Sequence, residues 1–358
     1  MRVPVVLVTG VDPDAMAAAT VGLQWDLPTA VAVRHHIDVD RQVLERVVSD
    51  ATGVLEREEI ELEHACISCA LREDVVPTLE RLVESGRWES VVAHLPIGAE
   101  AVQVCNVLAW NTRLARHLRV ASVVCAMVGS TVVEDLLGDD LLRERDRHSS
   151  EEDARGVGEV AAAMIEYADV VVLSGSTDPV GVDLTQTLAR PGARVVEGTE
   201  HLTGSLVTGQ LHDHTLTSAW TAAVRPEELP PAVSSRVWTV DLRSAAAFHP
   251  DRLLDDLERL GAGRHRSRGC FWLPTRPGDT LVWDGAGGQL SIGRGEPWGR
   301  RTPFTRIVLT GVGLPPAHLD DSFESMLLRP AEHRASDTGW LASEDGFEPW
   351  LGPIRDVA

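Results

Sequence analysis

Apolar runs alternate with amphipathic stretches along the first 215 residues of the chain. Short apolar runs predict strands at residues 5–8, 29–35, 89–95, 121–128, 170–173 and 194–196. Between them, helical spacing of apolar positions predicts helices at 41–49, 71–84, 101–118 and 151–167, the last capped by Ser150. Apolar strands that alternate with helices form a mostly parallel sheet covered on both faces. The pattern therefore predicts an α/β, doubly wound domain over residues 1–215.

The pattern changes after residue 215. Residues 216–235 contain three prolines and a pair of serines, which is typical of a linker. Beyond it, strands are predicted at 236–242, 264–274, 279–284, 288–293 and 304–311, with helices at 249–260 and 315–328. Consecutive strands flanked by helices predict a smaller α+β domain over 236–330.

The last segment, residues 331–358, is acidic, and we expect a mostly extended tail. It carries Trp340 and Trp350. Exposed tryptophans either dock on their own domain or form a short partner-binding motif.

Composition agrees with an ordinary globular protein. The chain has 358 residues, 44% of them hydrophobic, which is enough for two cores. It has no apolar run of the roughly 18 residues that would indicate a membrane span, and no signal-peptide pattern at its start, so we expect a cytoplasmic protein without membrane contact. The five cysteines are an odd number and mostly far apart, which argues against a disulfide scaffold.

The charge of the chain limits its partners. A net charge of -21 repels phosphate backbones, so we expect no direct, non-specific binding of nucleic acid. A role at a nucleic acid would pass through a protein partner. All 33 basic residues are arginines, because the sequence contains no lysine.

Residues 4–20, PVVLVTGVDPDAMAAAT, have the strand, loop and helix layout in which nucleotide phosphates are bound. Thr9 and Gly10 remain from that pattern, but the lysine that reaches the β- and γ-phosphates is missing. Asp12 before Pro13 predicts a helix N-cap, and Asp14 adds a second carboxylate to the first turn. These carboxylates would repel a triphosphate and satisfy the free amides themselves. Thr9 and Gly10 therefore read as a vestigial phosphate loop.

The candidate metal site is the C-x-x-C pair Cys66 and Cys69. At this spacing two thiolates can reach one ion, and His64 and Glu63 offer the nitrogen and oxygen donors that zinc also accepts. The alternative is two half-buried thiols at the turn before the helix 71–84. A redox pair fits less well, because no aromatic residue or proline brackets the cysteines in the usual way.

A second candidate is LHDHT, residues 211–215. On an extended segment, His212 and His214 face the same side and can share one ion. The alternative is a solvated pair in the linker, which we favour.

Taken together, these motifs resemble the CobW family of P-loop GTPases, whose members handle zinc, cobalt or nickel. The stretch ACISCALRED resembles the family's metal motif G-C-x-C-C, with Cys66 and Cys69 at its first and last cysteines and Ser68 in place of the middle one. EYADVVVLSGSTD resembles the family's E-x-A-D-x-x-x-L-N-K-x-D segment, and FWLPTR resembles a strand of the CobW C-terminal domain. The resemblance implies a P-loop-NTPase-like domain, a CobW C-terminal domain and zinc as the ligand.

Two further nucleotide elements depart from the family pattern. Where the family has Asn-Lys-x-Asp for guanine, this chain has Ser174 to Thr177, with Asp178 one place late. After the strand 89–95, the sequence HLPIG stands where relatives carry an acidic residue near Mg²⁺. Together with the missing lysine, these departures predict a pseudo-GTPase with little or no GTP hydrolysis. GTP and Mg²⁺ are therefore doubtful cofactors.

The altered loop and the C-I-S-C motif are similar to an actinobacterial branch of the family that is produced when zinc is scarce. That branch is associated with recruiting a hibernation factor to ribosomes. The resemblance implies a zinc-responsive adaptor whose partners are a hibernation factor and the ribosome. Two alternatives remain open: a GTP-dependent zinc metallochaperone, and a structural assembly protein that binds neither ligand.

Overall fold

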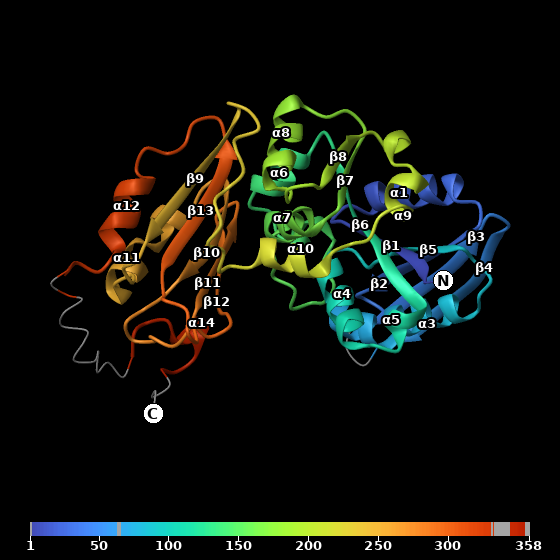
Figure 1. Ribbon diagram of the computed structural model, residues 1–358, viewed down its shortest axis with the longest axis horizontal. Coiled ribbons are helices and arrows are strands. Elements are labelled where there is room, and N and C mark those ends of the chain that lie inside the picture. Colours follow the sequence, from blue (N-terminus) through green and yellow to red (C-terminus); the bar gives the residue numbers. More distant parts are fainter. Residues whose placement is uncertain (1, 63–65, 331, 333–343, 355–358) are drawn as a thin grey trace. The chain divides into compact units, whose positions relative to one another are not determined.

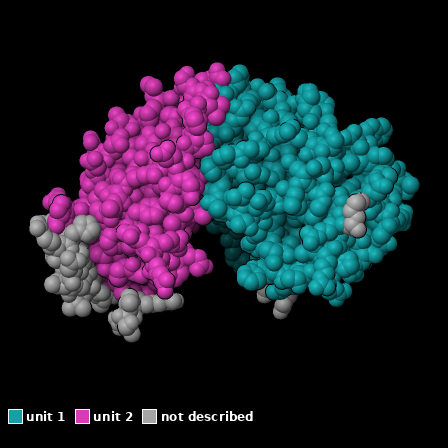
Figure 2. Space-filling view, viewed as in Figure 1, with its two compact units in different colours: residues 1–135, 140–221 teal, residues 136–139, 222–358 magenta. Residues whose placement is uncertain are grey.

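The computed structural model describes residues 2–62, 66–330, 332 and 344–354. Its internal contacts divide the chain into two units, Met1–Asp135 with Asp140–Thr221, and Leu136–Asp139 with Ala222–Ala358 (Figure 2). The division at residue 222 lies inside the predicted linker 216–235. The start of that linker is helical, because α10 runs through His214–Thr221.

The first unit is built on an eight-stranded sheet with the order β4-β3-β2-β5-β1-β6-β7-β8 (Figure 1). The strands are β1 (Val3–Thr9), β2 (Ala30–Asp38), β3 (Val43–Asp50), β4 (Gly53–Glu61), β5 (Ser90–His94), β6 (Leu118–Val128), β7 (Val170–Ser174) and β8 (Arg194–Glu197). Strands β2, β5, β1, β6, β7 and β8 pair in parallel, and β3 and β4 add an antiparallel hairpin. The predicted α/β, mostly parallel sheet is confirmed.

Helices cover both faces of this sheet (Figure 1). They are α1 (Pro13–Asp26), α2 (Ile67–Ala70), a π-helical turn (Leu71–Val75), α3 (Val76–Glu84), α4 (Ala101–Trp110), α5 (Leu114–His117), α6 (Val132–Leu137), α7 (Val157–Tyr167), α8 (Pro179–Leu188), α9 (Gly204–Thr208) and α10, with 3₁₀ turns at Leu142–Arg145 and Thr199–His201. Helix α1 buries Met16, Ala19 and Leu23 in a core shared with Val6 and Val8 of β1. The alanine-rich face lets the helix lie close to the sheet.

Three predicted helices differ from the structure. Most of the span 41–49 lies in strand β3 (Val43–Asp50), not in a helix, because Leu44 and Val48 are buried in the hairpin with β4. The helix predicted at 151–167 begins at Val157, since Asp153 accepts hydrogen bonds from the amide and hydroxyl of Ser149 in a preceding turn. The helix predicted at 101–118 is divided into α4 and α5, with Asn111 accepting from the amide of Leu114 at the break.

The second unit contains an antiparallel sheet together with the helices α11 and α12. Its strand order is β12-β11-β10-β13-β9. The elements are β9 (Val237–Ser244), α11 (Pro250–Gly261), β10 (His265–Phe271), β11 (Leu281–Ala286), β12 (Gln289–Arg294), β13 (Thr305–Val312) and α12 (Leu319–Met326). Its core clusters the aromatic residues Phe248, Phe271, Trp283 and Phe323. The predicted α+β domain is confirmed.

The chain near its end is not a simple extended tail. Residues 344–354 contain a short helix, α14 (Glu348–Leu351), and bury Phe347 and Leu351 in the core of the second unit. Trp350 is half exposed, and the centroid of its ring lies 6.0 Å from the ring centroid of Phe347. Trp340 lies outside the described residues. The expectation of an extended tail is wrong for 344–354, because its two apolar side chains complete a hydrophobic core. Within the described parts of the chain, no helix is long and apolar enough to cross a membrane.

Candidate functional sites

The loop between β1 and α1 lies at the carboxyl edge of the parallel strands, where α/β sheets bind their ligands. Thr9 is fully buried, and its hydroxyl donates to the carbonyl of Ala99 at 2.5 Å. The carbonyl of Gly10 accepts from the amide of Gly98 at 3.1 Å. A Cβ at Gly10 would lie 2.5 Å from the carbonyl oxygen of Ala126. Both residues therefore have packing roles, and their assignment to a vestigial phosphate loop stays a prediction.

Asp12 is the N-cap of α1, as the sequence predicts. Its Oδ1 accepts from the amides of Asp14 at 3.0 Å and Ala15 at 2.9 Å. Its Oδ2 accepts from Nη2 of Arg147 at 2.6 Å. A phosphate at a helix N-terminus would need these same amides. In this chain a carboxylate already uses them, and an arginine neutralises that carboxylate.

The two other altered nucleotide segments are also engaged within the fold. Asp178 accepts from the amide of Val180 at 2.8 Å and caps α8. His94, the last residue of β5, is buried and hydrogen-bonded through Nδ1 to the carbonyl of Leu95 at 3.0 Å. Burial, aided by the charge of Arg34, lowers the pKa of His94 to about 4. A neutral imidazole therefore lies at this strand end at neutral pH.

The C-x-x-C pair lies at the start of α2. Cys66 is half-buried and its Sγ accepts from the amide of Cys69 at 3.3 Å, so this thiol caps the helix. Cys69 is buried. The hydrogen bond with Cys66 raises the pKa of the Cys69 thiol, and burial raises it further. Both are free thiols. His64 and Glu63 lie outside the described residues, so zinc ligation by these four residues stays a prediction.

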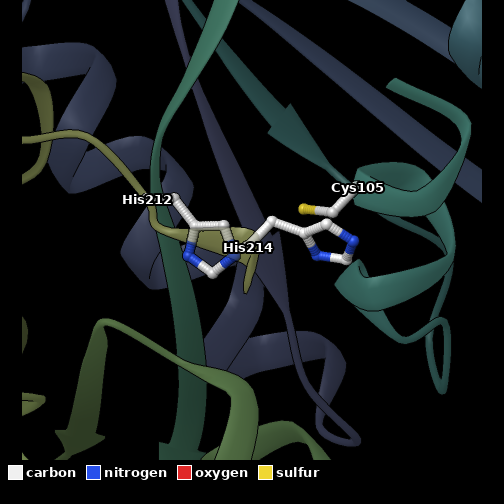
Figure 3. A group of neighbouring side chains, drawn as sticks. All are labelled: Cys105, His212 and His214. Atoms are coloured by element: carbon white, nitrogen blue, oxygen red, sulfur yellow. The ribbon is translucent and has the colours of Figure 1, made fainter. Parts of the chain in front are cut away.

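A second group of metal-binding side chains is formed by Cys105, His212 and His214 (Figure 3). Cys105 projects from α4, His212 follows α9, and His214 is the first residue of α10. One sulfur or nitrogen atom from each residue lies within 4.8 Å of the other two. Cys105 and His212 are buried, and His214 is half-buried. The interpretation of the two histidines as a solvated linker pair is therefore wrong.

Cys105 was missed from the sequence because more than a hundred residues separate it from the histidines. The only local signal is its position on the apolar side of α4, next to the buried Val104 and Leu108. Such a position is equally typical of a structural cysteine. The fold alone brings the thiol to the H-x-H pair.

Hydrogen bonds orient the two imidazoles. Nδ1 of His212 lies 2.8 Å from Oδ2 of Asp169, which fixes this nitrogen as the donor and leaves Nε2 with its lone pair. The hydroxyl of Tyr167 lies between the rings, 3.2 Å from Nε2 of His212 and 2.6 Å from Nδ1 of His214. Asp169 is itself held by the amide of Val123 at 2.7 Å and by Arg190. Burial raises the pKa of the Cys105 thiol to about 12.

The cluster opens onto a cavity of about 180 Å³ in the first unit. Cys105, His212 and His214 line it together with apolar residues such as Leu108 and Leu118. A small ion can therefore reach the three side chains from outside.

Comparison with known proteins finds a similar family for each of the two units. Residues 30–194 match the family described as CobW/HypB/UreG, nucleotide-binding domain, and residues 237–327 match the cobalamin synthesis protein cobW C-terminal domain. The first unit is therefore similar to a CobW/HypB/UreG nucleotide-binding domain, and the second unit is similar to a CobW C-terminal domain.

Among individual proteins, the chain is similar to the zinc chaperone Rv0106 of Mycobacterium tuberculosis. The two are 29% identical over 319 residues, which cover 83% of this chain and 74% of that protein. It is also similar to zinc-regulated GTPase metalloprotein activator 1 of Dictyostelium discoideum, at 22% identity over 65% of this chain and 53% of that protein. Among solved structures, the Zn(II)-bound YjiA GTPase from E. coli aligns over 91% of this chain and 99% of that one, with 16% identity and a TM-score of 0.34.

Proposed function

We propose that this chain is a zinc-responsive protein of the CobW type that no longer hydrolyses GTP and acts as an adaptor for another protein. The observation that carries the proposal is the carboxylate of Asp12 on the first amides of α1. A triphosphate bound there would have to displace this carboxylate and separate it from Arg147. No lysine is present to supply the missing positive charge.

The magnitude of the loss supports an inactive loop. Removing one donor that stabilises developing charge costs about 3–4 kcal/mol in a transition state. The chain lacks the loop lysine, and the guanine-reading segment has lost its lysine as well. The match to the nucleotide-binding family covers residues 30–194 and leaves out the β1–α1 loop. These losses together favour a protein selected for something other than hydrolysis.

Zinc is the metal that the comparisons favour, since one relative is a zinc chaperone and another is a zinc-regulated GTPase metalloprotein activator. In this chain Cys66 and Cys69 are the proposed ligands, joined by His64 and Glu63. Zinc can regulate a contact only if it binds one conformation or partner state more tightly than the other. The net charge of -21 favours a protein as the direct partner, and we propose a hibernation factor, through which the chain reaches the ribosome.

A GTP-dependent zinc metallochaperone is the second candidate. It is favoured by the names of the relatives, one called a zinc chaperone and the other a zinc-regulated GTPase. A metallochaperone of this kind requires saturable GTP binding, although Asp12 already occupies the first amides of α1. The adaptor does not require GTP binding, so this measurement separates the two candidates.

A calorimetric titration with GTP and Mg²⁺ tests the proposal. We expect no saturable heat and no phosphate release by highly purified protein. Saturable GTP binding with turnover would contradict the proposal and favour the metallochaperone. The adaptor role is tested by affinity purification from cells grown with and without zinc. Ribosomal subunits should accompany the chain only when zinc is limiting.

The zinc assignment needs a separate experiment. Zinc competition against a chromophoric chelator should give a weaker affinity for the Cys66→Ser/Cys69→Ser protein than for the wild type. If wild type and the double variant bind zinc equally tightly, the Cys66–Cys69 pair is not a zinc site.

A further inference from the structure

We propose that Cys105, His212 and His214 form a second zinc site in the first unit, separate from the Cys66–Cys69 pair. The inference stands on the geometry of these residues and does not depend on the adaptor role. One thiolate and two imidazoles are a donor set that zinc favours. Three protein ligands also leave a fourth position for water or an exchanging ligand.

The three ligand atoms would have to move only slightly closer together to coordinate zinc. In a tetrahedral site, sulfur and nitrogen ligands at about 2.3 and 2.1 Å from the ion lie about 3.5 Å from one another. The atoms of this cluster lie within 4.8 Å of one another, so a movement of about 1 Å brings them into range. His214 is only half-buried and begins a helix, which gives its side chain room to move.

Asp169 is the second, independent observation for a metal site. Histidines that bind metals usually donate their other ring N–H to a carboxylate or carbonyl, which fixes the tautomer and orients the ring. Asp169 accepts from Nδ1 of His212 at 2.8 Å, so Nε2 faces Cys105 and His214 with its lone pair. The carboxylate is in turn fixed by the amide of Val123 and by Arg190. This arrangement orients the ring before any ion arrives.

Tyr167 explains how the two rings are held together. Its hydroxyl lies within hydrogen-bond distance of Nε2 of His212 and Nδ1 of His214. Coordination replaces these hydrogen bonds with bonds to the ion. The thiol proton of Cys105 is exchanged for the ion and passes to solvent, so the step releases one proton. The cavity of about 180 Å³ beside the cluster provides the path.

The position of the site gives the ion a structural consequence. Cys105 belongs to α4, and His214 begins α10, the last helix before the chain enters the second unit at Ala222. A bound ion therefore ties the start of α10 to α4.

Cobalt(II) titration of the full chain tests the site, because a cobalt–thiolate bond has a strong charge-transfer absorption and tetrahedral cobalt has intense visible bands. The titration uses reduced, metal-stripped Cys66→Ser/Cys69→Ser protein, so that the remaining signal cannot come from that pair. We expect one equivalent of cobalt with a thiolate band, displaced by zinc. Absence of that band in this protein overturns the proposal.

Three further substitutions in the same background assign the ligands. Cys105→Ser should abolish the thiolate band, and His214→Gln, at a half-buried position that folding tolerates, should weaken cobalt binding about tenfold or more. Asp169→Asn should weaken it about 10- to 100-fold. His201→Gln, at an exposed histidine of the same unit, is the matched control and should change nothing. A thiolate band that survives Cys105→Ser, or unchanged affinity in His214→Gln, overturns the site.

The outcome is distinguishable from failure of the proposed function. GTP titration and ribosome recovery report on the adaptor role and do not involve these three ligands. Loss of the cobalt signal with unchanged GTP and partner results would remove only the second site.

Discussion

Arg147 donates from Nη2 to Oδ2 of Asp12 at 2.6 Å, although 135 residues separate the two in sequence. The other oxygen of the same carboxylate accepts two amides of α1. Both side chains are mostly buried, at 21% and 12% exposure. One carboxylate therefore caps the helix and pairs with a distant cation at the place where a nucleotide-binding loop would present free amides.

Removing this carboxylate should destabilise the first unit even without nucleotide. Asp12→Ala should lower the free energy of unfolding by about 1–2 kcal/mol, because the cap is lost and Arg147 loses its partner. Asp12→Asn should lower it by less, since an asparagine can still cap the helix. Urea denaturation measures both. The control is Asp14→Ala, at the exposed neighbouring position, which should change stability by less than about 1 kcal/mol. Equal stability of Asp12→Ala and wild type would contradict the capping role.

Gly10 is the second residue whose role can be separated from phosphate binding. A Cβ at this position would lie 2.5 Å from the carbonyl of Ala126 and 2.9 Å from Cγ of Met16. Gly10→Ala should therefore lower the free energy of unfolding by about 1–3 kcal/mol in buffer without nucleotide. Gly278→Ala, where a Cβ would meet no atom within 4 Å, is the control and should be nearly neutral. If the two variants unfold at the same urea concentration, the packing explanation fails.

The middle position of the cysteine motif predicts a gain of metal affinity. Ser68 is exposed on α2, between Cys66 and Cys69. Ser68→Cys adds a third thiol to the motif, so zinc affinity measured by chelator competition should rise, by about tenfold for each 1.4 kcal/mol that the new bond contributes. Ser85→Cys, at the exposed C-cap position that follows the last residue of α3, adds a thiol away from the motif and should leave the affinity unchanged. An unchanged affinity for Ser68→Cys would indicate that the pair does not hold zinc.

How much the sequence predicts depends on the range of the interactions. The Asp12 cap follows from an Asp-Pro pair next to an alanine-rich stretch, which is a local signal, and it is confirmed. Residues 41–49 show an apolar spacing compatible with either a helix or a strand, and pairing with β2 and β4 decides for the strand. The helix prediction at 41–49 is wrong because the sequence alone does not show which strands this segment pairs with.

The candidate sites follow the same division. The C-x-x-C and H-x-H pairs are visible in the sequence because their members are near neighbours. Cys105 and Asp169 could not be joined to His212 from the sequence, since the sheet and α7 are needed to bring them together. A metal site built from distant elements becomes visible only in the fold.

His94 predicts a measurable pH dependence of stability. Burial and the nearby Arg34 lower its pKa from 6.5 to about 4. Between these values the unfolded chain binds a proton that the folded chain does not, so stability falls as the pH falls from about 6.5 towards 4. At pH 5 the loss from this residue is about 2 kcal/mol relative to pH 7.5.

Comparison of wild type with His94→Gln isolates this contribution. The buried His265 also has a lowered pKa, but it is present in both proteins and cancels in the difference. Urea denaturation at pH 7.5 and pH 5 should show a smaller loss of stability for His94→Gln. Identical losses in the two proteins would mean that His94 is protonated in the folded state at pH 5.

The last prediction concerns the segment near the end of the chain. Arg276 and Asp345 form a buried bidentate pair, with Nε to Oδ2 at 2.8 Å and Nη2 to Oδ1 at 2.9 Å. The same carboxylate accepts from the hydroxyl of Thr275 at 2.7 Å and from the amide of Phe347 at 3.2 Å. This pair fixes the turn that directs Phe347 into the core.

Asp345→Ala should cost about 3–5 kcal/mol, because it leaves a buried guanidinium without its main partner. The segment 344–354 should then detach and withdraw Phe347 and Leu351 from the core, which hydrogen exchange of its amides would detect. Glu332→Ala removes the partly exposed ion pair with Arg252 and is the control, with an expected cost below about 1 kcal/mol. Both substitutions remove one carboxylate from the second unit, but only the carboxylate of Asp345 is buried and also accepts from Thr275 and Phe347. Equal costs and unchanged exchange in 344–354 would show that the buried pair does not hold this segment.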